Sequence, residues 1–358
     1  MNFTIEPLSP LYVEDALALL RAASEKGEVL YKPLEKSDYL ERFQGPGCAA
    51  FAATAEGRLI GWVHAAWQTS FLPGEDANNT PLYLTLLVVD AQHRRQGVGR
   101  ALLHTVSELG RSMHKKHLVV SSNNPIHLTW LIPGAGGHDH NNAPGVNEET
   151  PGYAYLLHQG FHDDFHEISM YINLKDYHWD PALDDKIAAL AAEGIRVGRW
   201  EPGLGEDYNG MCDRVGSEYW RNVLRQELTA WHEHRPNSDP ECWPDGRKPA
   251  GPRVLLTATK DDQIIGFTGP VDLQQSGRGW FTGICTDPAW GGRGIASVLF
   301  NLLMKEFVAE GAAFTSLFTG KTNFAQKIYL GAGLRITSNW AVMSLPLADG
   351  EKYDKKYF

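Results

Sequence analysis

The sequence predicts an α/β protein built from two copies of one unit, and three observations lead to this prediction. The chain has 358 residues, which is more than a single hydrophobic core usually organises. Hydrophobic patterns typical of strands and of helices alternate along it. The order strand, turn, helix, hairpin, glycine turn and helix occurs in the first half and occurs again in the second.

Corresponding segments of the two halves show the repeat in detail. Residues 3–20 read as a short strand, a turn and a helix, and residues 195–215 have the same order. A two-stranded hairpin follows in each half, and its second strand carries Ile-Gly both times, at Ile60-Gly61 and at Ile265-Gly266. Near the end of each half, GFHDDFHEISMYINL aligns with GLRITSNWAVMSLPL without a gap. The repeat therefore covers nearly the whole chain.

These alignments place the domain boundaries. We expect an N-terminal domain over residues 1–176, a linker helix over 177–194 and a C-terminal domain over 195–358. Pro181 suits the first turn of the linker helix and Gly194 suits its C-terminal stop.

The N-terminal copy contains an insertion, Leu131–Gly152, that its counterpart lacks. The segment is rich in Gly, Pro and Asn and reads as a long loop, and long loops in compact domains are usually functional or disordered. His138-Asp139-His140 lies within it and could begin a metal site. Because no further Cys or His pair has the spacing of metal ligands, we expect no metal.

The net charge and the cysteine content limit the possible binding partners and the cellular compartment. The net charge is −10, which argues against a general binder of nucleic acid or of an anionic membrane surface. The four cysteines form no CxxC pair, as is typical of reduced thiols in a cytosol. The N-terminal stretch is acidic where a signal peptide would be basic, and no apolar run approaches the roughly 20 residues of a membrane span. We therefore expect a soluble, cytoplasmic protein.

The most informative stretch is the glycine turn QHRRQGVGRALL, which follows the apolar strand LYLTLLVV and opens a helix. Backbone N–H groups of such a turn point outward at a helix N-terminus, where the helix dipole also favours an anion. Glycine permits positive φ and lets a ligand approach the backbone closely. We therefore predict a diphosphate site formed by Arg94, Arg95, Gln96, Gly97, Val98, Gly99 and Arg100. Its counterpart in the second half is Gly292, Arg293, Gly294, Ile295 and Ala296.

Two common nucleotide motifs do not fit these turns. The dinucleotide-binding fingerprint GxGxxG requires glycine at the position of Leu102. The phosphate loop GxxxxGK[ST] is suggested by Gly320-Lys321-Thr322, but Thr315 stands where its first glycine is required. Neither nucleotide motif is therefore present at these positions.

RRQGVG does fit the pattern [Gln/Arg]-x-x-Gly-x-[Gly/Ala], and with its repeat the sequence resembles the GNAT superfamily of N-acetyltransferases in tandem. The resemblance implies two domains, each a mixed, mostly antiparallel sheet flanked by helices. It implies acetyl-CoA as co-substrate, with the pyrophosphate on the glycine turn. It also implies that the strand before the turn meets the coenzyme through its backbone, at Val88, Val89, Cys285 and Thr286.

The resemblance further implies a catalytic tyrosine that protonates the leaving thiolate, four residues before Gly-Phe on the next helix. In the second half Tyr329 has this register, and Asn323 falls on the asparagine that contacts CoA in the family. In the first half the register falls on Leu156, and Tyr155 is one residue off, about 100° around a helix. We therefore predict that the C-terminal half is catalytic and that the N-terminal half binds CoA weakly, nonproductively or as a scaffold; the reverse assignment is the alternative.

The function implied is direct transfer of an acetyl group from acetyl-CoA to a small amine. Two other functions are open: a non-catalytic protein that binds or senses acyl-CoA, and an acyltransferase with another donor such as aminoacyl-tRNA. The net negative charge of the chain argues against aminoacyl-tRNA as the donor. The sequence does not identify the general base or the acceptor. Asp90 and Asp287, which follow the central strands, read as turn or cap residues.

Overall fold

The computed structural model describes residues 2–71, 74–238, 242, 248–348 and 353, and the chain divides into two compact units. Unit 1 comprises Met1–Ser169 together with Thr337–Phe358, and unit 2 comprises Met170–Ile336. Among the described residues, no helix combines the length and the apolar character needed to cross a membrane.

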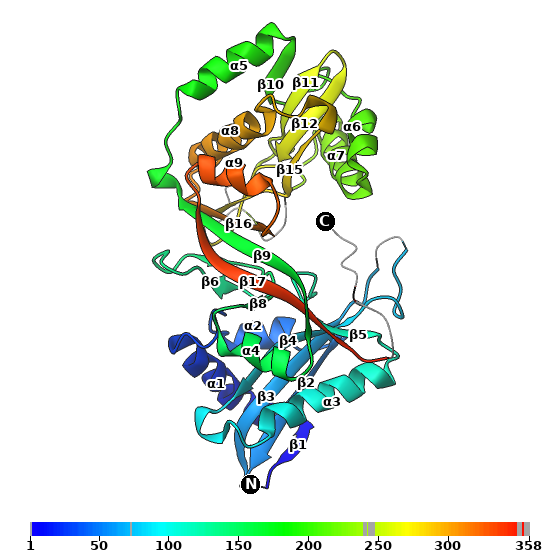
Figure 1. Cartoon of the computed structure of the whole chain (residues 1–358), viewed down its shortest axis with the longest axis vertical. Helices are drawn as coiled ribbons and strands as arrows, with labels where there is room; N and C mark the ends of the chain where they lie inside the picture. The colour runs from blue at the N-terminus through cyan, green and yellow to red at the C-terminus, as the bar shows by residue number, and fades with distance from the viewer. Residues whose placement is uncertain (1, 72–73, 239–241, 243–247, 349–352, 354–358) are drawn as a thin grey trace. The chain divides into compact units, whose positions relative to one another are not determined.

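Unit 1 begins with a strand and two helices, continues with a hairpin and a central strand, and then places its longest helix after the glycine turn (Figure 1). Its elements are β1 Thr4–Pro7, α1 Val13–Glu25, α2 Lys36–Arg42, β2 Cys48–Ala55, β3 Arg58–Trp67, β4 Leu82–Val89, α3 Val98–Ser112, β5 His117–Val120, β6 Trp130–Leu131, β7 Asp139–His140, β8 Val146–Asn147, α4 Pro151–His158 and β9 His162–Asn173, whose last residues lie in unit 2.

The sheet of unit 1 has the strand order β1-β2-β3-β4-β5-β17, where β17 spans Arg335–Pro346. All neighbours are antiparallel except β4 and β5, which are parallel. β3 is buried along nearly its whole length, so both faces of the sheet are covered. Helices α1 and α3 lie on opposite sides of these strands (Figure 1). The mixed, mostly antiparallel sheet expected from the sequence is therefore present in this unit.

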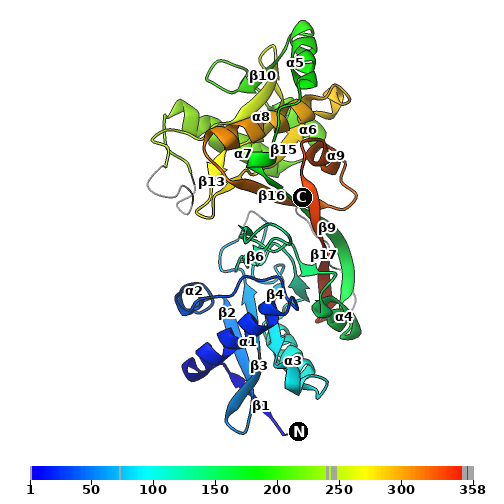
Figure 2. The same cartoon turned by 90° about the vertical axis from the view of Figure 1, so that its left-hand side faces the viewer.

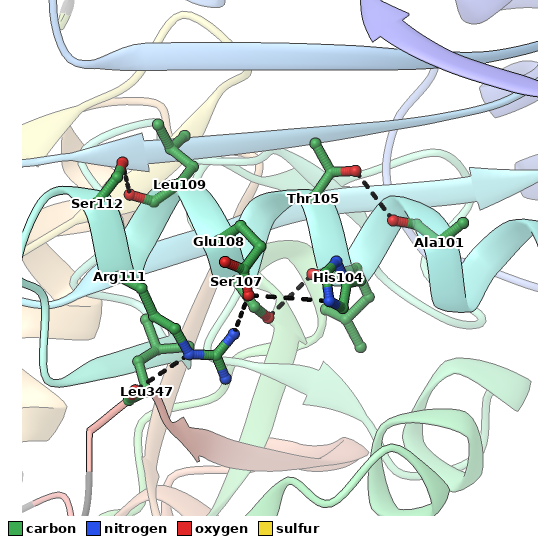
Figure 3. A network of polar contacts seen from close by, with 10 residues as sticks. Ala101, His104, Thr105, Ser107, Glu108, Leu109, Arg111, Ser112 and Leu347 are labelled. Carbon is green, nitrogen blue, oxygen red and sulfur yellow. Dashed lines mark hydrogen bonds and ion pairs between the residues drawn. The ribbon is translucent and has the colours of Figure 1, made fainter.

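The last strand of the chain belongs to unit 1, although the sequence prediction assigns residues 195–358 to one C-terminal domain. β17 pairs with β5 from Met343–Val120 to Pro346–His117. Arg111 on α3 donates from Nε to the carbonyl of Leu347 at 3.2 Å (Figure 3). These contacts place Thr337–Phe358 with unit 1, and residues 170–176 lie in unit 2 rather than in the predicted N-terminal domain.

Unit 2 repeats the order of unit 1. The strands β10-β11-β12-β15 form one antiparallel sheet, while β14 pairs antiparallel with β13 and parallel with β16. The elements are α5 Ala182–Ala192, β10 Ile195–Arg199, α6 Asn209–Val215, α7 Glu218–His232, β11 Leu256–Lys260, β12 Gln263–Gly269, β13 Asp272–Leu273, β14 Arg278–Trp280, β15 Gly283–Thr286, α8 Ile295–Ala309, β16 Phe314–Gly320 and α9 Ala325–Gly331.

The linker helix predicted from Pro181 to Gly194 is confirmed as α5. Pro181 is its N-cap, and Gly194 follows its end with φ of 74°. Figure 2 shows α5 beside β10 within unit 2. The predicted insertion differs from an irregular loop, because Leu131–Gly152 contains β7, β8 and one end of β6 before α4 begins at Pro151.

Candidate functional site

The two glycine turns have the same backbone construction. Each follows a strand, passes through a short 3-10 helix (η2 Ala91–His93 or η5 Pro288–Trp290) and ends at the N-terminus of a long helix. The aspartate before each 3-10 helix caps it, as expected: Asp90 accepts a hydrogen bond from the N–H of Gln92, and Asp287 accepts one from the N–H of Ala289. The local sequence therefore builds the same turn twice.

Backbone dihedrals confirm this equivalence residue by residue. Arg95 and Gly97 have φ of 60° and 87°, and the corresponding residues Gly292 and Gly294 have φ of 78° and 80°. Gly97 and Gly294 are the N-caps of α3 and α8. A left-handed residue at a helix N-cap turns successive N–H groups outward, and this arrangement suits a diphosphate.

Arg94 holds the first turn in place. Its guanidinium donates two hydrogen bonds to the carboxylate of Glu28, at 2.9 and 2.6 Å, and a third from Nε to the carbonyl of Val89 at 3.0 Å. The hydrogen bond from Arg94 lowers the pKa of Glu28. Since Arg94 is engaged in this way, the side chains left to meet an anion at the turn are those of Arg95 and Arg100.

The strand before the first turn separates from its neighbour. β4 pairs with β5 only at Leu82–Leu118 and Tyr83–Val119, although β4 continues to Val89. Its pairing with β3 also shifts register between His64 and Ala65, opposite the part of β4 that contains Thr85. The β5-facing edge of β4 beyond Tyr83 therefore leaves backbone groups available to an extended ligand.

A cavity of about 780 Å³ joins this open edge to the glycine turn. Leu84–Val89 of β4 form one wall, the turn with Arg95 and Arg100 closes one end, and α4 lies along another side. The inserted segment contributes Val146 and Asn147, and the C-terminal strand contributes Trp340. The predicted residues Val88, Val89, Arg94, Arg95, Gly97, Gly99 and Arg100 all line this cavity.

Two buried polar atoms in the cavity wall lack partners among the described residues; the sequence analysis did not name Asn147 and set Tyr155 aside as off register. Asn147 is 5% exposed, and its Nδ2 has no hydrogen-bond partner among the described residues. Its Oδ1 accepts from the N–H of Glu149 at 3.0 Å, which fixes the amide so that Nδ2 is the free end. Tyr155 likewise has a buried hydroxyl without a described partner.

Tyr155 lies against the first turn. A Cβ added at Gly99 would lie 3.2 Å from the Tyr155 hydroxyl, so the ring packs where any larger side chain would intrude. Burial raises the pKa of Tyr155 to about 12, so its hydroxyl keeps its proton at neutral pH. Leu156, which has the register of the family tyrosine, is 5% exposed and packs in the core.

In unit 2 the predicted residues lie in different surroundings. Tyr329 is 6% exposed with its ring centroid 4.8 Å from that of Phe300, and burial raises its pKa to about 12. Asn323 lies two residues before α9, where its Oδ1 accepts from the N–H of Ala325, the first residue of the helix, at 3.0 Å and its Nδ2 donates to Thr319. Tyr329 therefore lies on α9 and Asn323 just before it, in the order that the sequence predicted.

The second turn carries an ion pair and an aromatic stack. Arg293 donates from Nε to the Glu193 carboxylate at 3.1 Å, and its guanidinium lies 5.1 Å from the centroid of the Trp290 ring. A Cβ added at Gly294 would lie 3.8 Å from the side chain of Lys186 on α5. The linker helix and the residue that follows it thus supply neighbours to this turn.

The strand before the second turn holds the last two predicted positions. Cys285 is buried, which raises the pKa of its thiol to about 12, and Thr286 pairs with Gly266 on β12. A Cβ added at Gly283, earlier in the same strand, would lie only 2.4 Å from the Trp220 ring. An aromatic side chain therefore packs directly on β15, whose counterpart in unit 1, β4, borders the cavity.

Asp139 and His140 of the inserted segment contact other residues of the protein. Asp139 forms an ion pair with Lys32 at 2.7 Å, and His140 stacks on Trp130 with ring centroids 5.7 Å apart. Among the residues that the structure describes, no group of three or more His, Cys, Asp or Glu is placed to hold a metal ion.

Comparison with known proteins agrees with this architecture. The model of the acetyltransferase (GNAT) family matches residues 16–127 and again residues 217–331, which together are more than half of the chain. The chain belongs to the GNAT family. It is an acyltransferase with two tandem GNAT domains, and members of the family generally use acetyl-CoA as co-substrate.

Solved structures resemble this GNAT protein in fold at low sequence identity. A GCN5-related N-acetyltransferase from Sphaerobacter thermophilus has a TM-score of 0.56 and 16% identity, covering 98% of each chain. A tandem GNAT protein from the clavulanic acid biosynthesis pathway has a TM-score of 0.52 and 14% identity, covering 98% of this chain and all of that one.

A third similar structure belongs to a longer protein. It contains the GCN5-related glucosamine N-acetyltransferase region of a fungal multi-domain GH3 β-N-acetylglucosaminidase, with a TM-score of 0.61 and 16% identity. The match covers 96% of this GNAT protein but only 38% of the fungal chain. None of the curated protein sequences compared with the chain matches it.

Proposed function

We propose that this GNAT protein transfers an acetyl group directly from acetyl-CoA to a small amine, and that unit 1 holds the coenzyme. The observation that carries the proposal is the cavity of about 780 Å³ that connects the first glycine turn with the open edge of β4. None of the four cysteines, all of which the structure describes, is in a disulfide, which is in keeping with a reaction in the reducing cytoplasm.

The walls of this cavity suit each part of acetyl-CoA. The diphosphate would accept hydrogen bonds from the N–H groups around Gly97–Gly99, with Arg95 and Arg100 supplying positive charge. The pantetheine arm would run along Leu84–Val89, where the separation of β4 from β5 leaves backbone groups available. Asn147 Nδ2 would donate to one of the carbonyl oxygens of that arm, since a buried donor without a partner is costly.

The thioester carbonyl would lie at the end of the cavity that borders the irregular part of β4. A backbone N–H there can stabilise the negative charge that develops on the oxygen when the amine attacks. The amine must reach the carbonyl carbon from above the plane of the thioester, where its attack forms the C–N bond and a tetrahedral intermediate; the C–S bond breaks when this intermediate collapses. The alternative is that the reaction takes place in unit 2 with Tyr329 as the acid, which stays a prediction from the sequence.

Two measurements on the intact protein test the proposal. Calorimetric titration with acetyl-CoA should show binding, and thiol release from acetyl-CoA should accelerate with at least one member of a panel of small amines. Acetyl-CoA binding without amine-dependent thiol release would instead support a protein that binds or senses acyl-CoA. If neither acetyl-CoA nor CoA binds, the donor is a different molecule.

A further inference from the structure

Besides Tyr155, a second tyrosine lines the cavity, at the place where β4 and β5 separate. Tyr31, in the segment between α1 and α2, lines the large cavity and also a smaller cavity beside it. Both cavities are bordered by Leu84, Thr85 and Val120, where β4 and β5 separate. Tyr31 therefore stands at the junction between the coenzyme cavity and the interior beyond the strand separation.

The backbone on both sides of Tyr31 is hydrogen-bonded to residues 129–131 and to α1. Tyr31 forms an antiparallel bridge with Trp130, and its carbonyl accepts a hydrogen bond from Ser24 Oγ at 2.8 Å. On either side, the N–H of Leu131 donates to Leu30 at 2.8 Å and the N–H of Lys32 donates to Thr129 at 2.9 Å. These contacts fix the backbone from which the Tyr31 side chain extends at the edge of the two cavities.

The hydroxyl of Tyr31 is left free for a ligand. No hydrogen bond joins it to another residue that the structure describes. Burial raises the pKa of Tyr31 to about 12, so the hydroxyl carries its proton at neutral pH. Nearby polar groups are already engaged: Asn124 Nδ2 donates to Thr85 Oγ1 at 3.0 Å.

Tyr155 occupies the other end of the same cavity. Its hydroxyl lies against Gly99 in the first turn of α3, beside the predicted diphosphate position, whereas Tyr31 borders Leu84 and Thr85. The length of the pantetheine arm separates a diphosphate from the sulfur of the same coenzyme. The two tyrosines would therefore meet different parts of acetyl-CoA.

We propose that the Tyr31 hydroxyl donates a hydrogen bond to the coenzyme sulfur and protonates it as the acetyl group leaves. The proposal rests on the proposed function of unit 1. In the step, the amine nitrogen forms a bond to the carbonyl carbon, the C–S bond breaks with its electron pair on sulfur, and the Tyr31 proton passes to that sulfur to give CoA thiol. The proton lost by the nitrogen passes to solvent, and solvent returns a proton to the tyrosinate.

A binding cycle tests this contact without knowledge of the acceptor. CoA and desulfo-CoA, which lacks the sulfur, are titrated by calorimetry into the wild type, Tyr31→Phe and Tyr155→Phe at pH 9.5. Raising the pH increases the thiolate fraction of CoA, and a charged acceptor strengthens a hydrogen bond donated to it. Circular dichroism of each variant checks that the fold is kept.

The wild type should prefer CoA over desulfo-CoA by about tenfold, the ratio that corresponds to one such hydrogen bond. Tyr31→Phe should lose most of that preference, while Tyr155→Phe should weaken both ligands alike and keep it. A Tyr31→Phe variant that binds CoA and retains the full preference overturns the proposal for Tyr31 alone. A wild type that binds neither ligand overturns the proposed function, and the assignment of Tyr31 with it.

Turnover gives a second test once an acceptor is found. Tyr31→Phe should lower kcat by roughly 10²- to 10⁴-fold, the range of general acid–base groups, with little change in the affinity for acetyl-CoA. If kcat is unchanged in Tyr31→Phe, the proton reaches the sulfur from another source and the proposal is wrong.

Discussion

In unit 1 the turn that ends at Gly97 borders a cavity of about 780 Å³, while in unit 2 the turn that ends at Gly294 carries an Arg293–Glu193 ion pair. The two turns have nearly the same dihedrals, so the backbone motif is common to both units. What differs is the wall around it, because Asn147 comes from an insertion found only in unit 1 and Trp340 comes from the last strand of the chain. The comparison teaches that a glycine turn supplies an anion site, whereas the additional walls decide whether a whole coenzyme fits.

Removal of a cavity wall should give the largest effect on coenzyme affinity. Trp340 is buried in unit 1 and donates from Nε1 to Ser169 Oγ at 2.9 Å, so Trp340→Ala should cost about 3–5 kcal/mol of stability. Loss of this wall should also weaken CoA binding by about 30-fold, or about 2 kcal/mol. Trp200→Ala is the matched control, since Trp200 is fully buried in unit 2. Denaturant unfolding and calorimetry should show similar destabilisation but unchanged CoA affinity in the control; equal loss of affinity in both would remove the distinction between the units.

Removal of positive charge at the first turn should give a smaller effect. Arg95 has φ of 60° and lines the cavity, so Arg95→Gly keeps the backbone conformation and deletes the charge. CoA affinity should fall by about tenfold, as expected for a hydrogen bond between charged groups. Arg293→Ala in the second turn should leave the affinity unchanged. Calorimetry at two salt concentrations would check the assignment, because the Arg95 contribution should shrink as salt rises; a loss of affinity in Arg293→Ala alone would place the coenzyme in unit 2.

Replacing Tyr155 or Tyr329 by phenylalanine distinguishes catalysis in unit 1 from the sequence-based prediction that Tyr329 is the acid. Tyr155→Phe should weaken CoA binding by about fivefold, the effect of one neutral hydrogen bond, and leave kcat nearly unchanged. Tyr329→Phe should change both by less than about twofold if unit 1 is catalytic. The competing prediction that Tyr329 is the acid requires a drop in turnover of roughly 10²- to 10⁴-fold in that variant. Thiol-release kinetics on both variants decide between the two.

An ion pair between a half-exposed arginine and a buried aspartate in unit 2 should affect stability but not coenzyme binding. Arg214 donates two hydrogen bonds to Asp287, whose side chain is fully buried, and this lowers the pKa of Asp287. A carboxyl with a lowered pKa adds stability above its ordinary pKa of about 4 and loses that contribution as pH falls through its folded value. Arg214→Gln should therefore lower the thermal midpoint at pH 7, with a difference that shrinks toward acid pH. A constant difference from pH 7 to pH 2 would contradict this origin.

Local features of the site could be predicted from the sequence because neighbouring residues determine them. The glycine turns, the Asp90 and Asp287 caps and the linker helix from Pro181 all follow from short-range patterns of glycine, proline and capping residues. Tyr329 also lies on the helix that its spacing to Gly333 predicts. These features need no knowledge of distant parts of the chain.

Long-range features could not be predicted in the same way. The segment GLRITSNWAVMSLPL aligns with the end of the first half and forms β17. A strand pattern does not specify which strand it pairs with, and β17 pairs with β5. Counting back from Gly160 selects Leu156, while the rotation of α4 turns Leu156 into the core and Tyr155 toward Gly99. Asn147 and Tyr31 carry no sequence signal, since contacts between distant parts of the chain bring them to the cavity.

The central claim is that unit 1 holds the coenzyme, and one calorimetric comparison tests it most directly. Gly97 and Gly294 have φ of 87° and 80°, so Gly97→Val and Gly294→Val impose a similar backbone strain at equivalent N-caps. Titration with acetyl-CoA should show one tight site in the wild type, the same site in Gly294→Val and its loss in Gly97→Val, with both variants folded by circular dichroism. Tight binding that survives in Gly97→Val and disappears in Gly294→Val would contradict the account and assign the coenzyme to unit 2.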